Sequence, residues 1–275
     1  MLNYSDKVTL PIGIEVDGVR YREVIIDEMT GVDEENLVSK KVRNNGAKAV
    51  TVLLQRCIQE IPGLLDRKSN PLSLIDERLV RKMYVADRDY LTICIRALSD
   101  KSEFHSEIEC PHCSSKNNLT FDVKEMDVYD WDENTTAELN IELPRGFWSA
   151  STQQYHNKIV WKFPTGDVQE RLASLPQDQV ATRSITAGIV SVEGMDTCPS
   201  VEDVRRLSLR DRNAFAEALS EESVGVNTKM DLTCPDCESE FSTEVSMMGF
   251  FNSGGSETKR RSVVGKSGRK LRKRG

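Results

Sequence analysis

Cys110-Pro-His-Cys113 and Cys234-Pro-Asp-Cys237 are the two stretches that decide the fold of this 275-residue chain. Each follows a strand-like run, and a polar turn separates it from a second run that alternates with period two. Strand, Cys-x-x-Cys, turn and strand form one half of a zinc ribbon, so the chain carries two halves. Four thiolates fit a closed tetrahedral Zn²⁺ site with no position open for chemistry. The sequence therefore predicts one structural zinc ion bound by Cys110, Cys113, Cys234 and Cys237.

A redox site is the main alternative for these cysteines. Cys-Pro-His-Cys is also the active-site sequence of thiol oxidases of the thioredoxin superfamily, where the first cysteine opens a helix whose dipole lowers the thiol pKa. Here Ser114–Asn118 leads into Leu119–Val123, which alternates and indicates a strand. A redox site also gives no reason for a second, similar motif. We therefore favour structural zinc, and a site shared between subunits stays an open alternative.

The interval between the two motifs is unusually long. Between Cys113 and Cys234 lie 120 residues, whereas ordinary ribbons have about fifteen to twenty. Closing such a loop costs about 5 kcal/mol of chain entropy, and a structural zinc site supplies about 10–16 kcal/mol at neutral pH. Zinc can therefore close the loop, more easily if the intervening segment folds by itself and brings its ends together.

The two motifs belong to longer, similar units. Asp87-Arg88 lies 23 residues before Cys110, and Asp211-Arg212 lies 23 residues before Cys234. Each Asp-Arg pair opens a helix-like stretch, which a polar connector joins to the cysteine motif. We expect a degenerate internal repeat, since repeats package one supersecondary unit each; the alternative is coincidence of a common dipeptide with two common turns.

The remaining patterns indicate a mixture of helices and strands. Val8–Val16 and Val19–Ile26 flank Asp17-Gly18, a strong hairpin signal. Apolar spacing predicts a helix over Lys48–Ile61, and Gln177–Val192 fits either a helix or a strand. We predict an α+β fold in which an N-terminal β-hairpin and helices accompany a small four-cysteine zinc-ribbon sheet formed by two distant knuckles.

This interpretation divides the chain into five parts. They are an N-terminal hairpin plus helical domain (1–100), the first zinc knuckle (101–127), an inserted α/β segment (128–199), a helix plus the second zinc knuckle (200–251), and a flexible basic C-terminal arm (252–275).

Composition is typical of a soluble protein with a large hydrophilic surface, at 38% hydrophobic and 29% charged residues. No apolar run approaches a membrane span, and the first residues lack the layout of a signal peptide. Seven cysteines, four of them in metal-type motifs, fit a reducing compartment better than a disulfide scaffold.

Charge is divided between an acidic body and a basic arm. The overall net charge is −7, but the 28 basic and 43 acidic residues outside the arm give the body −15. Asn252–Ser256 has the composition of a flexible linker, and we expect the arm to be disordered alone. We expect it to fold onto an acidic groove of a neighbouring protein through nine cationic residues: Lys259, Arg260, Arg261, Lys266, Arg269, Lys270, Arg272, Lys273 and Arg274.

The order of these features resembles a family from tailed bacteriophages. It comprises Val8-Thr-Leu-Pro-Ile-Gly13, the Asp-Gly hairpin, Glu28–Glu35, a helix opened by Asp87-Arg88, two Cys-Pro-x-Cys knuckles and a closing Phe250-Phe251. This layout, over roughly residues 5–251, is similar to the T4-type baseplate hub family, which also supplies tail assembly proteins to contractile-tailed phages. The resemblance implies a structural baseplate component in the virion tail, assembled in the host cytoplasm with other tail proteins. A tail assembly chaperone that leaves the particle is the alternative.

We expect no catalytic site and no small-molecule substrate. Nothing pairs the three histidines, His105, His112 and His156, with a nucleophile, and no Gly-rich phosphate loop is followed by Lys-Ser/Thr. A zinc-ribbon protein that uses its basic arm on nucleic acid is a further alternative. The acidic body should repel a phosphate backbone, so we favour protein partners.

Overall fold

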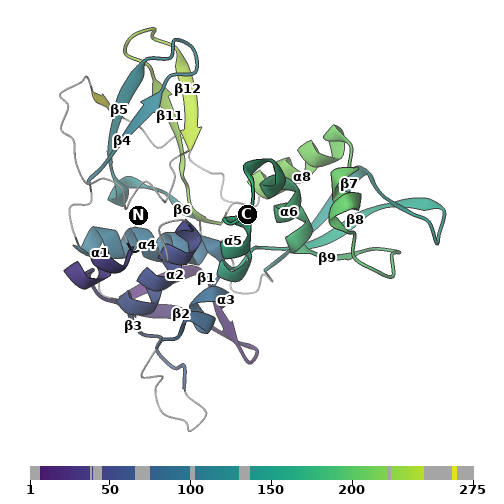
Figure 1. The fold of residues 1–275 in the computed structure, drawn as a ribbon, viewed down its shortest axis with the longest axis horizontal. Helices are drawn as coiled ribbons and strands as arrows, with labels where there is room; N and C mark the ends of the chain where they lie inside the picture. The colour runs from purple at the N-terminus through teal and green to yellow at the C-terminus, as the bar shows by residue number, and fades with distance from the viewer. Residues whose placement is uncertain are drawn as a thin grey trace, which may run out of the picture.

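The computed structural model has three parts: an N-terminal half, a small ribbon that packs on it, and a second half that extends to one side (Figure 1). It describes residues 7–37, 39, 45–65, 75–99, 103–129, 137–221, 224–244 and 262–264. This mixture of helices and strands confirms the predicted α+β class. None of the helices in these ranges is long and apolar enough to cross a membrane.

The N-terminal half is built on the predicted hairpin. Strands β1 (Lys7–Val16) and β2 (Val19–Ile26) pair antiparallel up to Val16 and Val19. Asp17 and Gly18, between them, have φ of 51° and 78°, as a tight turn that matches the strand twist requires. Strand β3 (Ile58–Glu60) pairs with β2 and gives the sheet order β1-β2-β3.

Four helices accompany this sheet: α1 (Gly31–Leu37), α2 (Gly46–Cys57), α3 (Glu77–Lys82) and α4 (Val85–Ser99). The helix predicted to end at Ile61 ends instead at Cys57. Ile58 leaves helical geometry (φ −78°, ψ 115°) because its segment pairs with β2, more than thirty residues earlier in the chain. Leu10, Val24, Leu54 and Leu91 lie fully buried in the core between sheet and helices.

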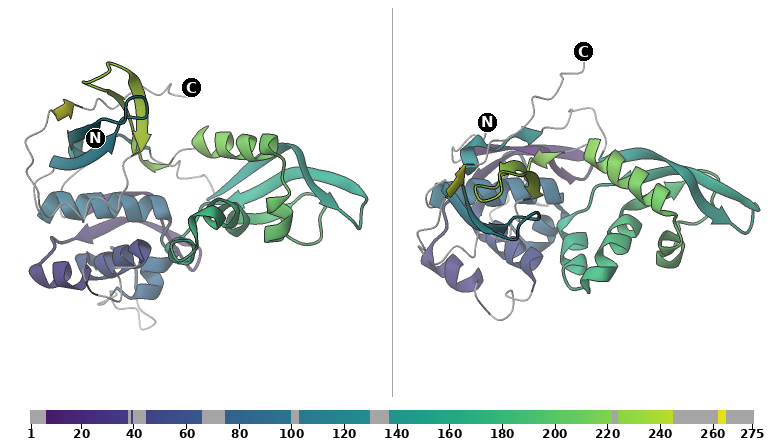
Figure 2. Two further views of the ribbon diagram at one scale, coloured as in Figure 1. Left: turned by 45° about the horizontal axis from the view of Figure 1, so that its top comes forward. Right: turned by 90° about the horizontal axis from the view of Figure 1, so that it is seen from above.

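The ribbon consists of two antiparallel hairpins from distant parts of the chain (Figure 2). Strands β4 (Glu103–Glu109) and β5 (Lys116–Asp122) form the first, and β11 (Lys229–Thr233) and β12 (Glu240–Glu244) form the second. The short η1 helix (Val123–Glu125) and the pair β6 (Val128–Tyr129) and β10 (Gly225–Val226) lie where the hairpins join the rest. Phe104, Phe121, Met230 and Leu232 of the ribbon belong to the same hydrophobic core as the N-terminal half.

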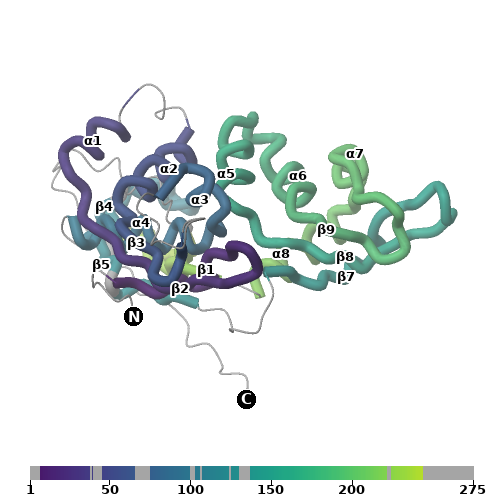
Figure 3. Tube along the Cα trace, turned by 90° about the horizontal axis from the view of Figure 1, so that it is seen from below, coloured from purple at the N-terminus to yellow at the C-terminus, as the bar shows by residue number. Residues whose placement is uncertain are grey.

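The second half has a hydrophobic core of its own. Its sheet has the order β7-β8-β9, with β7 (Glu138–Ser149), β8 (Gln154–Lys162) and β9 (Ile189–Val192). Its helices are α5 (Gly166–Leu172), α6 (Gln177–Gly188), α7 (Val201–Arg205) and α8 (Leu209–Glu221). The ambiguous stretch Gln177–Val192 is thus both, a helix that passes directly into a strand. Strands β7 and β8 extend away from the N-terminal half (Figure 3).

The two halves repeat one order of elements. Each has a hairpin, two helices, a third strand and two further helices, and ends in one hairpin of the ribbon. In both, a helix of 12 residues runs without a loop into the third strand. Gly63 and Gly194 then follow that strand, with φ of 84° and 82°. This correspondence confirms the predicted internal repeat and extends it over both halves. The predicted five-part division of the chain stays a prediction.

The aspartates of the repeated Asp-Arg pairs have the same structural role. Each repeat interrupts its first strand with Leu-Pro-x-Gly, at residues 10–13 and 143–146, and the strand register shifts there. Asp87 accepts hydrogen bonds from the N–H groups of Ile12 (2.8 Å) and Gly13 (2.9 Å). Asp211 accepts them from Arg145 (2.8 Å) and Gly146 (3.2 Å). Each aspartate therefore satisfies backbone donors that the bulge removes from the sheet.

The arginines correspond as well. Arg88 donates to the Thr51 hydroxyl at 2.9 Å, and both terminal nitrogens of Arg212 lie 3.3 Å from the Thr182 hydroxyl. Thr51 lies on α2, and Thr182 holds the equivalent place on α6. Arg88 is fully buried, whereas Arg212 is half-buried. Only the first arginine is covered, because α5 of the second half packs against its side of the molecule.

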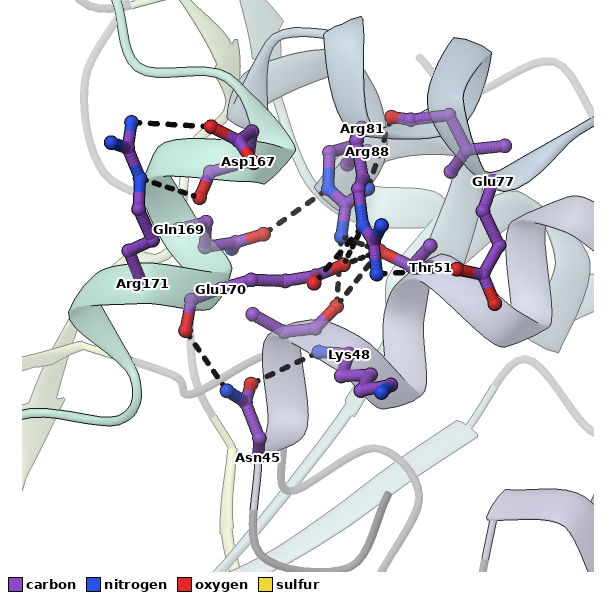
Figure 4. Close-up of polar contacts among 12 residues, drawn as sticks. Asn45, Lys48, Thr51, Glu77, Arg81, Arg88, Asp167, Gln169, Glu170 and Arg171 are labelled. Carbon is purple, nitrogen blue, oxygen red and sulfur yellow. Dashed lines mark hydrogen bonds and ion pairs between the residues drawn. The ribbon is translucent and has the colours of Figure 1, made fainter. Parts of the chain in front are cut away.

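The halves meet in a polar junction at α5 (Figure 4). Glu170 of α5 accepts hydrogen bonds from Thr51 (2.5 Å) and from Nε of Arg81 (3.1 Å to each oxygen). Gln169 accepts one from Arg88 at 3.1 Å. A Cβ atom on Gly166 would lie 2.4 Å from Nη1 of Arg88, so this glycine permits the close approach of α5.

Candidate metal centre

Both cysteine motifs adopt the same turn at the end of a ribbon strand. The N–H of Ser114 donates to Cys110 O at 2.9 Å, and that of Glu238 donates to Cys234 O at 2.9 Å. Ser114 and Glu238 share a φ of 58°, in the left-handed region. The turn directs both cysteine side chains of a motif to one side, which is the geometry of a zinc knuckle.

The four sulfur atoms lie together between the two hairpins. Sγ of Cys110 lies 3.8 Å from Sγ of Cys237, and Sγ of Cys113 lies 3.7 Å from Sγ of Cys234. All four sulfurs lie within 4.8 Å of one another. A Zn–S bond of about 2.3 Å in a tetrahedron places neighbouring sulfurs about 3.8 Å apart. The donor set and its spacing therefore fit a tetrahedral metal ion.

Neighbouring groups donate hydrogen bonds toward these sulfurs. The N–H of His112 lies 3.4 Å from Sγ of Cys110, and the Ser115 hydroxyl lies 3.3 Å from Sγ of Cys234. Nδ2 of Asn117 donates to the same Cys234 sulfur at 3.7 Å. Such donors stabilise thiolate charge and orient the ligands of a metal.

Sequence reasoning missed the contributions of Ser115 and Asn117. The available signal was a serine two residues after the second cysteine of each motif, Ser115 after Cys113 and Ser239 after Cys237.

The protonation behaviour of the cluster is uneven. Burial raises the pKa of Cys110 to about 11. A hydrogen bond from the Ser115 hydroxyl, helped by the N–H groups of Cys237 and Asp236, lowers the pKa of Cys234 to about 6. A bound metal ion would deprotonate a coordinating thiol outright.

The surroundings of the first motif do not match a thioredoxin-type site. After Cys113 the chain enters β5, a strand paired along its whole length with β4, where a redox site of that type has a helix. The second motif likewise continues into β12. Neither motif therefore has the helix whose dipole activates the first cysteine of a thioredoxin-type site.

His156 and the remaining three cysteines lie apart from the cluster. His156 is buried on β8, where it contacts the Thr152 hydroxyl (2.7 Å) and the carbonyl of Glu193 (2.9 Å). Cys57 and Cys94 are buried core residues, as their helical apolar patterns indicate. Cys198 is exposed and donates to the carbonyl of Val190 at 3.1 Å.

A family profile described as "T4 bacteriophage base plate protein" matches residues 1–192. This match covers more than half of the chain. The chain belongs to the T4 bacteriophage base plate protein family. No curated protein and no solved structure matches it.

Membership of this family gives the protein a structural role in the phage baseplate, with a place in the virion tail and assembly with other tail proteins. It also favours a non-enzymatic role. The matched segment contains Cys110 and Cys113 and ends at Val192. The second knuckle, with Cys234 and Cys237, therefore lies beyond the part of the chain that the family profile covers.

The nine cationic residues of the predicted arm lie outside the described residues. Within the range 252–275 the structure describes Ser262–Val264, which forms β13. This strand pairs in parallel with β5, over Asn118, Leu119 and Thr120. One segment of the arm thus adds a strand to the ribbon of its own chain.

Proposed function

We propose that this baseplate protein is a structural component of the hub region, in which one Zn²⁺ ion joins the two repeats of the chain. The observation that supports this proposal is the convergence of four sulfurs, two from each repeat, at tetrahedral spacing. Cys110 and Cys113 would bind the ion from the first repeat, and Cys234 and Cys237 from the second.

Zinc would supply a strong, closed cross-link at this position. Four thiolate ligands leave no site open for water or substrate, so the ion contributes folding free energy. The residues around it hold the thiolates in place: Ser115 and Asn117 donate toward Cys234, and the N–H of His112 donates toward Cys110. Each hairpin alone is a two-stranded sheet, which is marginally stable in water. The ion would therefore stabilise a ribbon that neither repeat can form alone.

Function then resides in contacts with other tail proteins. We propose that the arm at 252–275 binds an acidic surface of a neighbouring tail protein through its nine cationic side chains, an attraction that salt should screen. The pairing of β13, in the middle of the arm, with β5 supports this proposal, since it attaches the arm to the ribbon at one defined place.

The zinc proposal is tested by Cys234→Ser, with Cys198→Ser as the matched control. The first change removes a ligand, and the second removes an exposed thiol remote from the cluster. Metal content by mass spectrometry and thermal unfolding should both fall for Cys234→Ser and stay at wild-type values for Cys198→Ser. Full zinc content in Cys234→Ser, or oxidised and metal-free cysteine pairs in assembly-competent protein, would contradict the proposal.

The assembly proposal is tested by deleting the gene and imaging the particles produced. Arrested baseplates, together with the presence of the protein in purified virions, are expected. Normal, infectious tails without the protein would refute a structural role. If baseplates are arrested but mature virions contain no copy of the protein, the protein would be an assembly chaperone that leaves the particle.

The arm is tested by truncation after Gly265, which removes six cationic residues and retains β13. Zinc content and folding should be unchanged, while incorporation into tails should weaken, most visibly at low ionic strength, where salt screens the charges of the intact arm least. Equal incorporation at every salt concentration would exclude a docking role. If the loss of incorporation instead parallels a loss of binding to bare DNA, nucleic acid would be the partner of the arm.

A further inference from the structure

Two large aromatic side chains are exposed near the tip of the hairpin formed by β7 and β8. Trp148 is 53% exposed and Tyr155 is 43% exposed. Both lie next to the turn between the strands, and Figures 1 and 2 show that this hairpin extends away from the N-terminal half and the ribbon. Large exposed aromatic groups commonly indicate an interaction surface.

These side chains form an ordered cluster with Arg145. Trp148 and Tyr155 are direct cross-strand partners, with ring centroids 5.1 Å apart in an edge-to-face arrangement. Cζ of Arg145 lies 4.3 Å from the centroid of the Tyr155 ring, and its guanidinium donates a hydrogen bond to the Tyr155 hydroxyl. The three side chains are therefore held in place before any partner binds, which lowers the entropy lost on association.

The cluster borders a depression of about 360 Å³ against the junction of α7 and α8. Two carboxylates line it, but both are engaged by their own chain. Asp203 accepts from the Ser200 hydroxyl and N–H, and Asp211 accepts from Ser208 and from two backbone N–H groups. These hydrogen bonds leave both aspartates ionised, but Asp211 is buried and Asp203 is half-buried, whereas Arg145 and Arg206 are exposed, so the charged groups that this rim presents to a partner are mainly cationic.

The first repeat provides an internal comparison. Glu15 and Arg20 hold the equivalent cross-strand position in its hairpin, with Glu15 two residues after Gly13, just as Trp148 lies two residues after Gly146. The first hairpin thus forms the same cross-strand pairing with two charged side chains at this position. The aromatic pair is therefore not a requirement of the hairpin.

We infer that Trp148, Tyr155 and Arg145 form a docking surface for another tail protein, one that presents a carboxylate beside an apolar side chain. Trp, Tyr and Arg dominate the energetics of protein interfaces, and a guanidinium pairs with a carboxylate through two parallel hydrogen bonds. The depression receives the apolar group, and Arg145 with Arg206 receives the carboxylate. This inference rests on the assembly role proposed above.

Photo-crosslinking in assembling tails tests the inference. The full-length chain would carry a benzoylphenylalanine at position 148 or, as the matched control, at position 15, in cells infected by phage that lacks the gene. A crosslink from position 148 to a segment of another tail protein that contains Asp or Glu is expected, at about tenfold the yield from position 15. No excess over position 15, a crosslink only to a second copy of this chain, or one to nucleic acid would overturn the inference.

A pair of double variants gives a second measurement. W148S/Y155S should lower incorporation into tails about tenfold or more, while E15S/R20S should leave it unchanged. Zinc content and the urea midpoint followed by far-ultraviolet circular dichroism should match wild type in both, which separates lost docking from lost folding. Normal incorporation of W148S/Y155S, while gene deletion still arrests baseplates, overturns this inference alone. Normal baseplates after gene deletion overturn the proposed function and this inference with it.

Discussion

Replacing Arg88 by leucine tests the junction between the repeats. Arg88 is fully buried and donates to Ala47 O (2.8 Å), Thr51 Oγ1 (2.9 Å), Val80 O (3.1 Å) and Gln169 Oε1 (3.1 Å). Burial lowers its pKa to about 10, so the side chain is still charged at pH 7. Leucine keeps the apolar part of the side chain and loses all four hydrogen bonds.

The size of the effect follows from these contacts. A hydrogen bond to a charged group contributes about 1.5–3 kcal/mol net, so four contribute about 6 kcal/mol or more. Three terms reduce the loss: Ala47 O keeps the intrahelical N–H of Thr51, Val80 O keeps the Met83 N–H, and a buried leucine contributes about 1.5–3 kcal/mol. Arg81 continues to neutralise Glu170. We expect Arg88→Leu to lower the free energy of unfolding by about 3 kcal/mol, in the range for breaking a buried charged contact.

Arg212→Leu is the matched control, since Arg212 holds the equivalent position in the second repeat. It is half-buried, and its hydrogen bonds to the Thr182 hydroxyl are long, at 3.3 Å. We expect a loss below about 1 kcal/mol, as for substitutions near the surface.

The assay is urea unfolding at pH 7 with zinc present, followed by hydrogen exchange of the intact protein. Exchange should accelerate in α2 and α5 for Arg88→Leu, because both helices contact this guanidinium. Exchange in α8 should change little. Equal losses in the two variants, or a loss below about 1 kcal/mol for Arg88→Leu, would refute the argument that coverage by α5 makes the first arginine more important.

Three further predictions concern titration, a glycine and the metal. Burial tends to raise the pKa of Glu170, but hydrogen bonds from Thr51 and Arg81 outweigh burial and lower this pKa. The contribution of Glu170 to the free energy of unfolding should therefore be present above the ordinary pKa of 4.5 and lost as pH falls through the lowered pKa. Glu170→Gln should flatten the dependence of the urea midpoint on pH between about 5 and 2. A slope equal to that of wild type would exclude this role. Gly146→Ala should lower the melting temperature more than Gly18→Ala. Both glycines have positive φ, which costs about 1–2 kcal/mol for a residue with a side chain. At Gly146 a Cβ atom would in addition lie 2.1 Å from the carbonyl oxygen of His156, whereas at Gly18 it would meet no atom within 4 Å. Equal shifts would contradict the importance of that contact. Chelation of zinc should accelerate hydrogen exchange in the ribbon strands and leave α6 nearly unchanged, and unaffected ribbon strands would count against a structural metal.

Local sequence determined the features that depend on neighbouring residues. Asp17-Gly18 specifies the first hairpin because its backbone adopts the positive φ values that a tight turn needs. Ser200 and Asp203, three residues apart, form a capping box at the start of α7. The cysteine motifs specify two identical turns, and their equal distance from Asp87 and Asp211 indicated the repeat. Each of these signals acts over a few residues, so composition and spacing are enough to detect it.

Only the tertiary structure decided features that join distant segments. Ile58–Glu60 is a strand because β2 offers it a partner, although its own sequence continues a helical pattern. The hydrogen bonds of Asp87 and Asp211 span 75 and 66 residues. Trp148 is exposed because no other element of the described structure covers the tip of the hairpin formed by β7 and β8. Strand pairing, the burial of a charge and the exposure of a side chain all depend on residues that are distant in sequence and close in the fold. The sequence pattern around a residue does not identify those neighbours. The four cysteines combine both levels: their spacing predicted the chemistry, and the folding of both repeats brings the sulfurs within 4.8 Å.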